Sequence, residues 1–147
     1  MKQTRSVSKR RGRRAAQTRR LYSFEVTRLS DRKLRRIRSI GALRAFARRI
    51  WEHENTKRRE KMPEIVAGTG IKQGRVYLSY CEGRRRIVLA RHERNRRILA
   101  HELVHALGYS THGTGFCRRY FSIIRQFGGH LDAATSSALR VSPTSLR

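Results

Sequence analysis

The sequence predicts an α+β protein in which a long helix is followed by a three-stranded antiparallel or mixed sheet and then by two more helices. Between residues 34 and 51, apolar residues recur at steps of three and four. From residue 62 the chain changes to short runs of β-branched and aromatic residues that are separated by glycines, and after residue 93 the helical period returns. A length of 147 residues fits one domain with a modest core.

The first helix follows Ser30 or Asp31, either of which can cap its N-terminus. Its apolar stripe comprises Leu34, Ile37, Ile40, Leu43, Phe46, Ile50 and Trp51. The arginines of this segment fall largely off the stripe, so the pattern predicts a long amphipathic helix with a basic outer surface and a bend near Gly41.

Three strands are expected, at residues 64–67, 75–80 and 86–90, with Glu82-Gly83 as a hairpin turn between the last two. A helix is then expected from about residue 93 to 107, where Gly108 ends it. Another helix is expected over 114–127, before Gly128-Gly129, and one short helix near 132–139.

The N-terminal segment is expected to differ from the rest of the chain. Residues 1–20 carry nine Lys or Arg and no acid, and such a segment buries too little apolar surface to fold alone. We therefore expect a disordered basic arm over 1–24, a folded domain over 25–130 and a C-terminal tail over 131–147. The run 9–14 also loosely fits a transit peptide or a nuclear signal.

The formal charge of +26 predicts a polyanionic partner. It arises from 36 basic and 10 acidic residues, and 30 of the basic residues are arginines. Because guanidinium groups bind phosphate in bidentate fashion, we expect non-specific contact with DNA or RNA, although a GC-rich genome also raises the arginine content. The expected contacts are Arg10, Arg11, Arg13, Arg14, Arg35 and Arg36.

Other classes of protein fit less well. Cys81 and Cys117 alone form neither a disulfide framework nor a zinc ribbon. The sequence has no apolar run near the roughly 18 residues that a membrane span needs, and no secretory signal. We therefore expect an intracellular protein associated with nucleic acid, in a nucleoid, nucleus or virion, and neither a membrane protein nor a secreted one.

The most informative motif is His-Glu-Leu-Val-His at residues 101–105. Histidines four apart on a helix project from one face, so His101 and His105 can bind one zinc ion. Glu102 would then lie beside a water at the metal and could take its proton.

Zinc needs a third protein ligand that leaves one position for water. The chain has no Glu after residue 102, and the remaining candidates are His112, Cys117, His130 and Asp132. His112 is favoured because it follows the turn at Gly108, where the chain doubles back toward the helix. A buried structural thiol is the better interpretation of Cys117.

Residues 101–107 together with His112-Gly113-Thr114-Gly115-Phe116 resemble the SprT-like family of zinc metallopeptidases, which pairs H-E-x-x-H with a downstream H-G-x-x-F. The resemblance extends over about residues 34–127. It implies a zincin-like core, zinc held by His101, His105 and His112, Glu102 as general base and Phe116 packed behind the third ligand. Members of this family include proteases that act on DNA-bound proteins. The Cys-rich zinc-binding module often attached to them is not found in this sequence.

The expected function is therefore zinc-dependent hydrolysis of a protein substrate associated with nucleic acid. We expect the strand at 86–90 to border the cleft, and Tyr109 is a candidate for stabilising the oxyanion. An alternative is a structural nucleic-acid-binding protein of a virion or ribonucleoprotein that retains an idle zinc site. A toxin-like or host-directed protease is a third interpretation.

Overall fold

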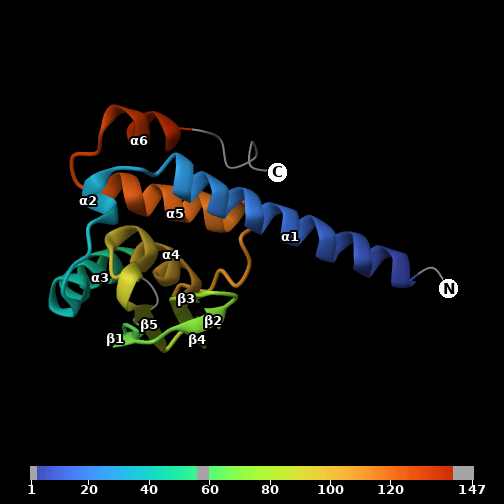
Figure 1. Cartoon of the computed structure of the whole chain (residues 1–147), viewed down its shortest axis with the longest axis horizontal. Coiled ribbons are helices and arrows are strands. Elements are labelled where there is room, and N and C mark those ends of the chain that lie inside the picture. The colour runs from blue at the N-terminus through green and yellow to red at the C-terminus, as the bar shows by residue number, and fades with distance from the viewer. Residues whose placement is uncertain (1–2, 56–59, 141–147) are drawn as a thin grey trace.

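The computed structural model describes residues 3–55 and 60–140, and for residues 3–11, 13 and 14 it describes the backbone alone. The helices are α1 (Gln3–Thr27), α2 (Arg32–Arg35), α3 (Ile40–Glu54), α4 (Arg96–Ala106), α5 (Thr114–Phe127) and α6 (Ala133–Ala138), with a 3-10 turn at Arg91–Glu93. The strands are β1 (Glu64–Gly68), β2 (Ile71–Gln73), β3 (Val76–Leu78), β4 (Tyr80–Glu82) and β5 (Arg86–Ala90). The predicted α+β class is confirmed (Figure 1).

The main sheet is mixed and has the strand order β1-β5-β4. β5 pairs in parallel with β1 and antiparallel with β4, so it is the central strand. The strand expected at 75–80 is divided at Ser79, and β3 pairs with β2 in a separate two-stranded sheet. The Ser79 hydroxyl accepts a hydrogen bond from the Ala90 N–H, and its own N–H donates to Glu93. These bonds hold the chain where it passes from one sheet to the other.

The predicted hairpin between β4 and β5 is confirmed. Gly83 and Arg84 have φ values of +50° and +66°, a left-handed conformation that glycine adopts at little cost. The Arg84 Nε donates to the Ala106 carbonyl oxygen at 3.0 Å. The hairpin turn therefore caps one of the free carbonyls at the C-terminus of α4.

The single long helix predicted from residue 34 to 51 is wrong. The structure has the short α2 and the longer α3, separated by residues 36–39 rather than bent at Gly41. The Asp31 carboxylate accepts from the Lys33 N–H, and the Ser39 hydroxyl accepts from the Ala42 N–H, so each helix has its own N-cap. Two capping residues eight positions apart favour two helix starts over one continuous helix.

Where the sequence predicts a disordered arm over residues 1–24, the structure has the helix α1, which spans Gln3–Thr27. Figure 1 shows α1 lying along α5 and extending away from the rest of the molecule toward its N-terminus. The anchor is at the other end of the helix. Leu21 is fully buried, and the Phe24 ring lies 5.1 Å from the Phe121 ring of α5. Arginine, glutamine and alanine are good helix formers, which favours the helical conformation in the part of α1 that precedes these contacts.

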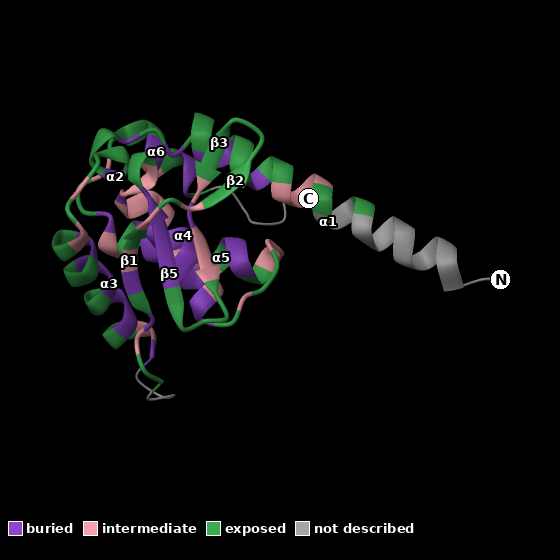
Figure 2. Ribbon diagram, turned by 60° about the horizontal axis from the view of Figure 1, so that its bottom comes forward, coloured by how far each residue is buried: buried purple, intermediate pink, exposed green. Residues whose placement is uncertain are grey.

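α4 is the central helix of the molecule. It contacts β4 and β5 on one side and α5 on another, and α3 packs against it as well. Figure 2 shows buried residues along α4 and β5 and exposed residues on the outer elements. α5 and α6 lie where the sequence predicts them, and α4 begins three residues later than predicted. No helix in the described part of the chain is long and apolar enough to cross a bilayer.

Candidate metal centre

The helix α4 and the loop after it bring three histidines together. The Asn95 side chain caps α4 by accepting from the Ile98 N–H at 3.0 Å. His101 and His105 follow one turn apart on the same face. After the helix Gly108 has a φ of +105°, which reverses the chain direction and returns His112 to α4.

The ring nitrogens of these histidines converge on one point. One nitrogen from each ring lies within 4.8 Å of the others. The Nε2 of His112 is 2.9 Å from that of His101 and 3.2 Å from that of His105. Among the described residues, the sequence-predicted ligand set therefore lies in one place.

The opposite nitrogen of each ring has a partner in the protein. The His101 Nδ1 donates to the buried Glu25 carboxylate at 2.9 Å, and the His105 Nδ1 donates to the Tyr109 carbonyl oxygen at 2.7 Å. The His112 Nδ1 lies 3.3 Å from the Thr18 hydroxyl. With Nδ1 as the donor, a neutral ring has its lone pair on Nε2, which is the form that binds a metal.

This arrangement fits a metal ion. In three neutral imidazoles with Nδ1 as the donor, the three Nε2 lone pairs would face and repel one another. A single added proton could form a hydrogen bond in only one of the two close Nε2 pairs. A cation at the point where they meet satisfies all three acceptors. Three histidines that leave a position open are also a known ligand set for catalytic metals.

The electrostatics of the rings agree with this view. Burial, and after it the charges of His101 and His105, lower the pKa of His112 to about 4. Burial and the charge of His101 also lower the pKa of His105. Burial lowers the pKa of His101, but the charge and hydrogen bond of Glu25 outweigh this and raise it. A proton on His101 would therefore compete with a metal for the same nitrogen.

Aromatic rings enclose the cluster. The Phe116 ring centroid is 4.8 Å from each of the three imidazoles, and Phe116 is 1% exposed. Tyr22 of α1 stacks on His101 at 5.6 Å with 14° between the planes. Tyr120 packs against the edge of His101. These rings restrict the imidazoles to one orientation and limit the access of water.

Glu102 does not join the histidine cluster but faces a cleft of about 410 Å³ beside it. The cleft is lined by His105, by Tyr22 of α1 and by Ser79–Cys81 at β4. Burial raises the pKa of Glu102 and outweighs the opposing charge of His101, so that the pKa is about 7. The cleft thus contains a carboxyl group next to one of the candidate metal ligands.

Comparisons of the chain with protein-family models, with curated proteins and with solved structures found no match. The interpretation of the site therefore depends on its geometry.

The other residues considered as third ligand lie elsewhere. The Cys117 sulfur is buried in the core and points to the His112 carbonyl oxygen at 3.9 Å. His130 is exposed and lines a different pocket. The Asp132 carboxylate caps α6 by accepting from the Thr135 N–H at 2.6 Å.

Two expectations about the cleft need correction. β5 is the central strand, with β1 on one side and β4 on the other, so it has no free edge at the cleft. The strand that borders the cleft is β4. Tyr109 acts through its backbone, since its carbonyl oxygen orients His105 while its hydroxyl is hydrogen-bonded to Arg119.

The predicted nucleic-acid contacts are only partly described. The side chains of Arg10, Arg11, Arg13 and Arg14 lie outside the described residues. Arg35 and Arg36 are exposed and line a pocket that shares no lining residue with the cleft at Glu102.

Three residues of the site were missed from the sequence, and all belong to α1. These are Glu25, which is 1% exposed and bound to His101, Tyr22, and Thr18. The sequence contains a pattern that could have identified Glu25. It is the first acidic residue in a segment rich in arginine, and it follows Leu21 and Phe24 at helical spacing. That pattern predicts a buried helix face, and a carboxylate on such a face needs a partner.

Proposed function

We propose that this chain is a zinc metallopeptidase of the SprT-like kind, with a zincin-like core, that acts on proteins associated with nucleic acid. The observation that carries the proposal is the convergence of His101, His105 and His112 beside a cleft that contains Glu102. Three imidazoles suit zinc, as they suit several other transition metals, and they leave a position open.

The outer hydrogen bonds support a catalytic ion rather than a chance cluster. A buried carboxylate, a backbone carbonyl and a hydroxyl each face one of the Nδ1 atoms. Partners of this kind set the tautomer of a metal-binding histidine and raise its basicity. The carboxylate comes from Glu25, which is 76 positions before its partner in sequence.

When bound, zinc lowers the pKa of a water molecule and polarises a carbonyl oxygen. The chain itself supplies the base and the cleft. Glu102 adjoins His101 in sequence and is 8% exposed, so its carboxylate can accept a proton from a water in the cleft while bulk solvent is largely excluded. The β4 edge and Arg84 line the same cleft, where an extended peptide would lie.

Tyr22 is the candidate for stabilising negative charge on the substrate. Tyr22 is 46% exposed, its ring stacks on His101, and it lines the same cleft as Glu102. A hydroxyl there can donate a hydrogen bond to a developing oxyanion.

The proposal is tested by the Glu102→Gln variant. Glutamine has nearly the same shape but cannot accept the proton, so hydrolysis of a basic protein substrate in the presence of zinc and DNA should fall by about 10²–10⁴-fold or more. Zinc content and thermal stability should stay close to those of the wild type, because Glu102 is not part of the histidine cluster.

The matched control is Glu82→Gln, an exposed carboxylate on β4 outside the lining of the cleft, which should retain activity. If the wild type cleaves no better than the Glu102→Gln variant, the peptidase proposal fails. If that zinc-loaded wild type also binds DNA, a structural nucleic-acid-binding protein with an idle metal site is the better description.

A further inference from the structure

A second pocket, away from the histidines, is unusually basic. It has a volume of about 870 Å³ and lies between α2 and the segment that joins α5 to α6. Five cations line it: Arg32, Lys33, Arg35, Arg36 and Arg38. All except Arg38 are exposed, and Arg38 is half-buried.

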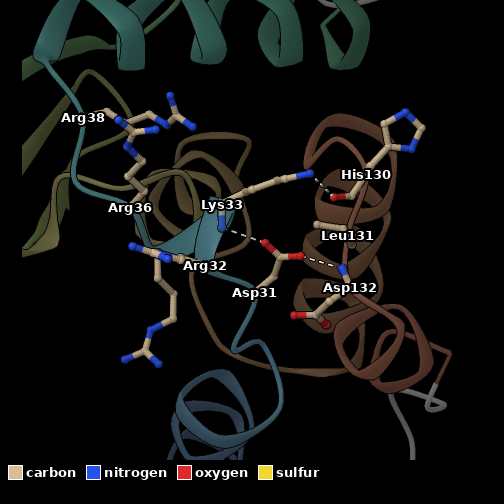
Figure 3. Close-up of a pocket in the computed structure, with 9 residues that line it drawn as sticks. Asp31, Arg32, Lys33, Arg36, Arg38, His130, Leu131 and Asp132 are labelled. Carbon is tan, nitrogen blue, oxygen red and sulfur yellow. Dashed lines mark hydrogen bonds between the residues drawn. The ribbon is translucent and has the colours of Figure 1, made fainter.

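The two acids of this pocket form no ion pair with its five cations. The Asp31 carboxylate accepts from the backbone N–H groups of Lys33 and Asp132, at 2.7 and 2.6 Å (Figure 3). The Asp132 carboxylate is engaged by the Thr135 N–H. Both acids therefore serve as backbone caps that hold α2 and α6 together.

The cations themselves lack anionic partners. In the part of the chain that the structure describes, none of the five forms an ion pair. The Lys33 ammonium group donates to the His130 carbonyl oxygen at 3.1 Å, a neutral acceptor (Figure 3). The exposed side chains of Arg32, Arg35 and Arg36 suit an anion that is rich in oxygen atoms.

The basic surface continues beyond this pocket in two directions. A neighbouring pocket of about 390 Å³ shares His130 and Leu131 with it and adds Arg125 and Arg140. On the other side, Arg38 lies close enough to Arg96 to affect its pKa. Burial lowers the pKa of Arg96, and the charges of Arg38 and Arg49 lower it further. A row of like charges favours a partner that carries many negative charges along its length over a single small anion.

We propose that this pocket and its continuation bind the phosphodiester backbone of nucleic acid without regard to base sequence. Arginine and lysine reach phosphate oxygens, and neither pocket is lined by Phe, Tyr or Trp, although the ring of His130 lines both. The site would supply the nucleic-acid contact that the proposed function invokes, but it depends on the basic pocket alone and not on hydrolysis.

The test compares two triple variants of the full chain in binding to labelled duplex DNA over a range of salt concentrations. The pocket variant is Arg32→Gln, Arg35→Gln and Arg36→Gln. The control removes the same charge from the hairpin side, by Arg75→Gln, Arg85→Gln and Arg91→Gln, which are exposed and outside both basic pockets. Long-range attraction to DNA should fall similarly in both variants, so the difference between them reports direct contact.

We expect the pocket variant to bind about tenfold or more weakly than the control near physiological salt. The slope of log K against log salt should become shallower by about two to three, since each lost phosphate contact contributes about 0.9. Equal affinities and slopes for the two variants would overturn the proposal. So would a pocket variant that loses binding of inorganic phosphate while its DNA affinity stays at the level of the control.

Circular dichroism and thermal melting of each variant exclude unfolding as the cause. Should the triple variant fail to fold, the single reversals Arg36→Glu and Arg85→Glu provide the same comparison with one change each. Binding is measured without any hydrolysis, so failure of this proposal and failure of the proposed peptidase function are separate results.

Discussion

Among single residues, Glu25 most changes the view of the metal centre. Its carboxylate is 1% exposed and faces the Nδ1 of His101, and the charge and hydrogen bond of His101 lower its pKa although burial raises it. A charged carboxylate in this position fixes the His101 tautomer and makes Nε2 a stronger donor to a metal. Glu25 is thus a positioning residue that acts through His101.

The Glu25→Gln variant should therefore bind zinc about 10–100-fold more weakly. A neutral amide is a weaker acceptor for the ring N–H than a carboxylate, so the Nε2 of His101 becomes less basic. Competition with a chromogenic chelator measures this affinity directly. The matched control is Glu54→Gln. The Glu54 side chain is 5% exposed and is paired with His53 and with Arg119, neither of which belongs to the histidine cluster. Equal zinc affinities of the two variants would show that Glu25 does not orient the ligand.

At the scale of secondary-structure elements, α1 joins an external segment to the metal centre. Leu21 and Phe24 anchor it in the core, while Thr18, Tyr22 and Glu25 face the histidines. The helix therefore contributes both to the stability of the fold and to the walls of the site.

Deleting residues 1–14 should leave metal affinity and the free energy of unfolding nearly unchanged, because the contacts of α1 to the histidines among the described side chains come from Thr18, Tyr22 and Glu25. Deleting residues 1–24 removes Leu21 and Phe24, each of which should cost about 2–5 kcal/mol when truncated. Thermal and denaturant unfolding of the two truncated proteins distinguishes these outcomes. Similar losses in both would mean that the contacts at residues 18–25 are not what anchors α1.

Some helices of this fold are predictable from sequence and others are not, for physical reasons. α5 was predicted well because its apolar period is sustained over fourteen residues, and a pattern of that length reports burial directly. α1 was missed because only its last turns are buried, and they pack against residues almost a hundred positions away. The division of residues 34–51 into two helices depends on caps at Asp31 and Ser39, which compete with a continuous helix.

The histidine cluster was predictable because two ligands are local on one helix. The third lies seven positions after His105, across a glycine turn whose direction follows from its left-handed conformation. The residues that orient the ligands were not predictable in the same way. The Nδ1 of His105 donates to a backbone carbonyl oxygen, which every residue type has, so the sequence does not indicate it. The Nδ1 of His101 donates to Glu25, which is 76 positions away in sequence.

For the molecule as a whole, the metal centre joins the N-terminal helix to a later part of the chain. α1 meets α4 and the loop that carries His112 at the cluster, although α1 is distant from both in sequence. An ion at this point would connect α4 to the loop through its ligands, and to α1 through Glu25 and Thr18. The unfolded chain does not hold the three nitrogens together, so the metal binds the folded state far more tightly. Metal binding must therefore stabilise the folded protein.

Removing the metal should therefore lower the melting temperature. With free zinc at 100 times its Kd, the stabilisation is about 2.7 kcal/mol, which for a chain of this size corresponds to about 5–10 °C. Melting curves of the chelated and zinc-loaded protein measure the shift. His112→Ala should abolish it, because two histidines hold zinc far less tightly than three. His130→Ala, which changes an exposed histidine outside the cluster, should preserve it. A zinc-dependent shift that survives in His112→Ala but disappears in His130→Ala would mean that the stabilising ion binds elsewhere.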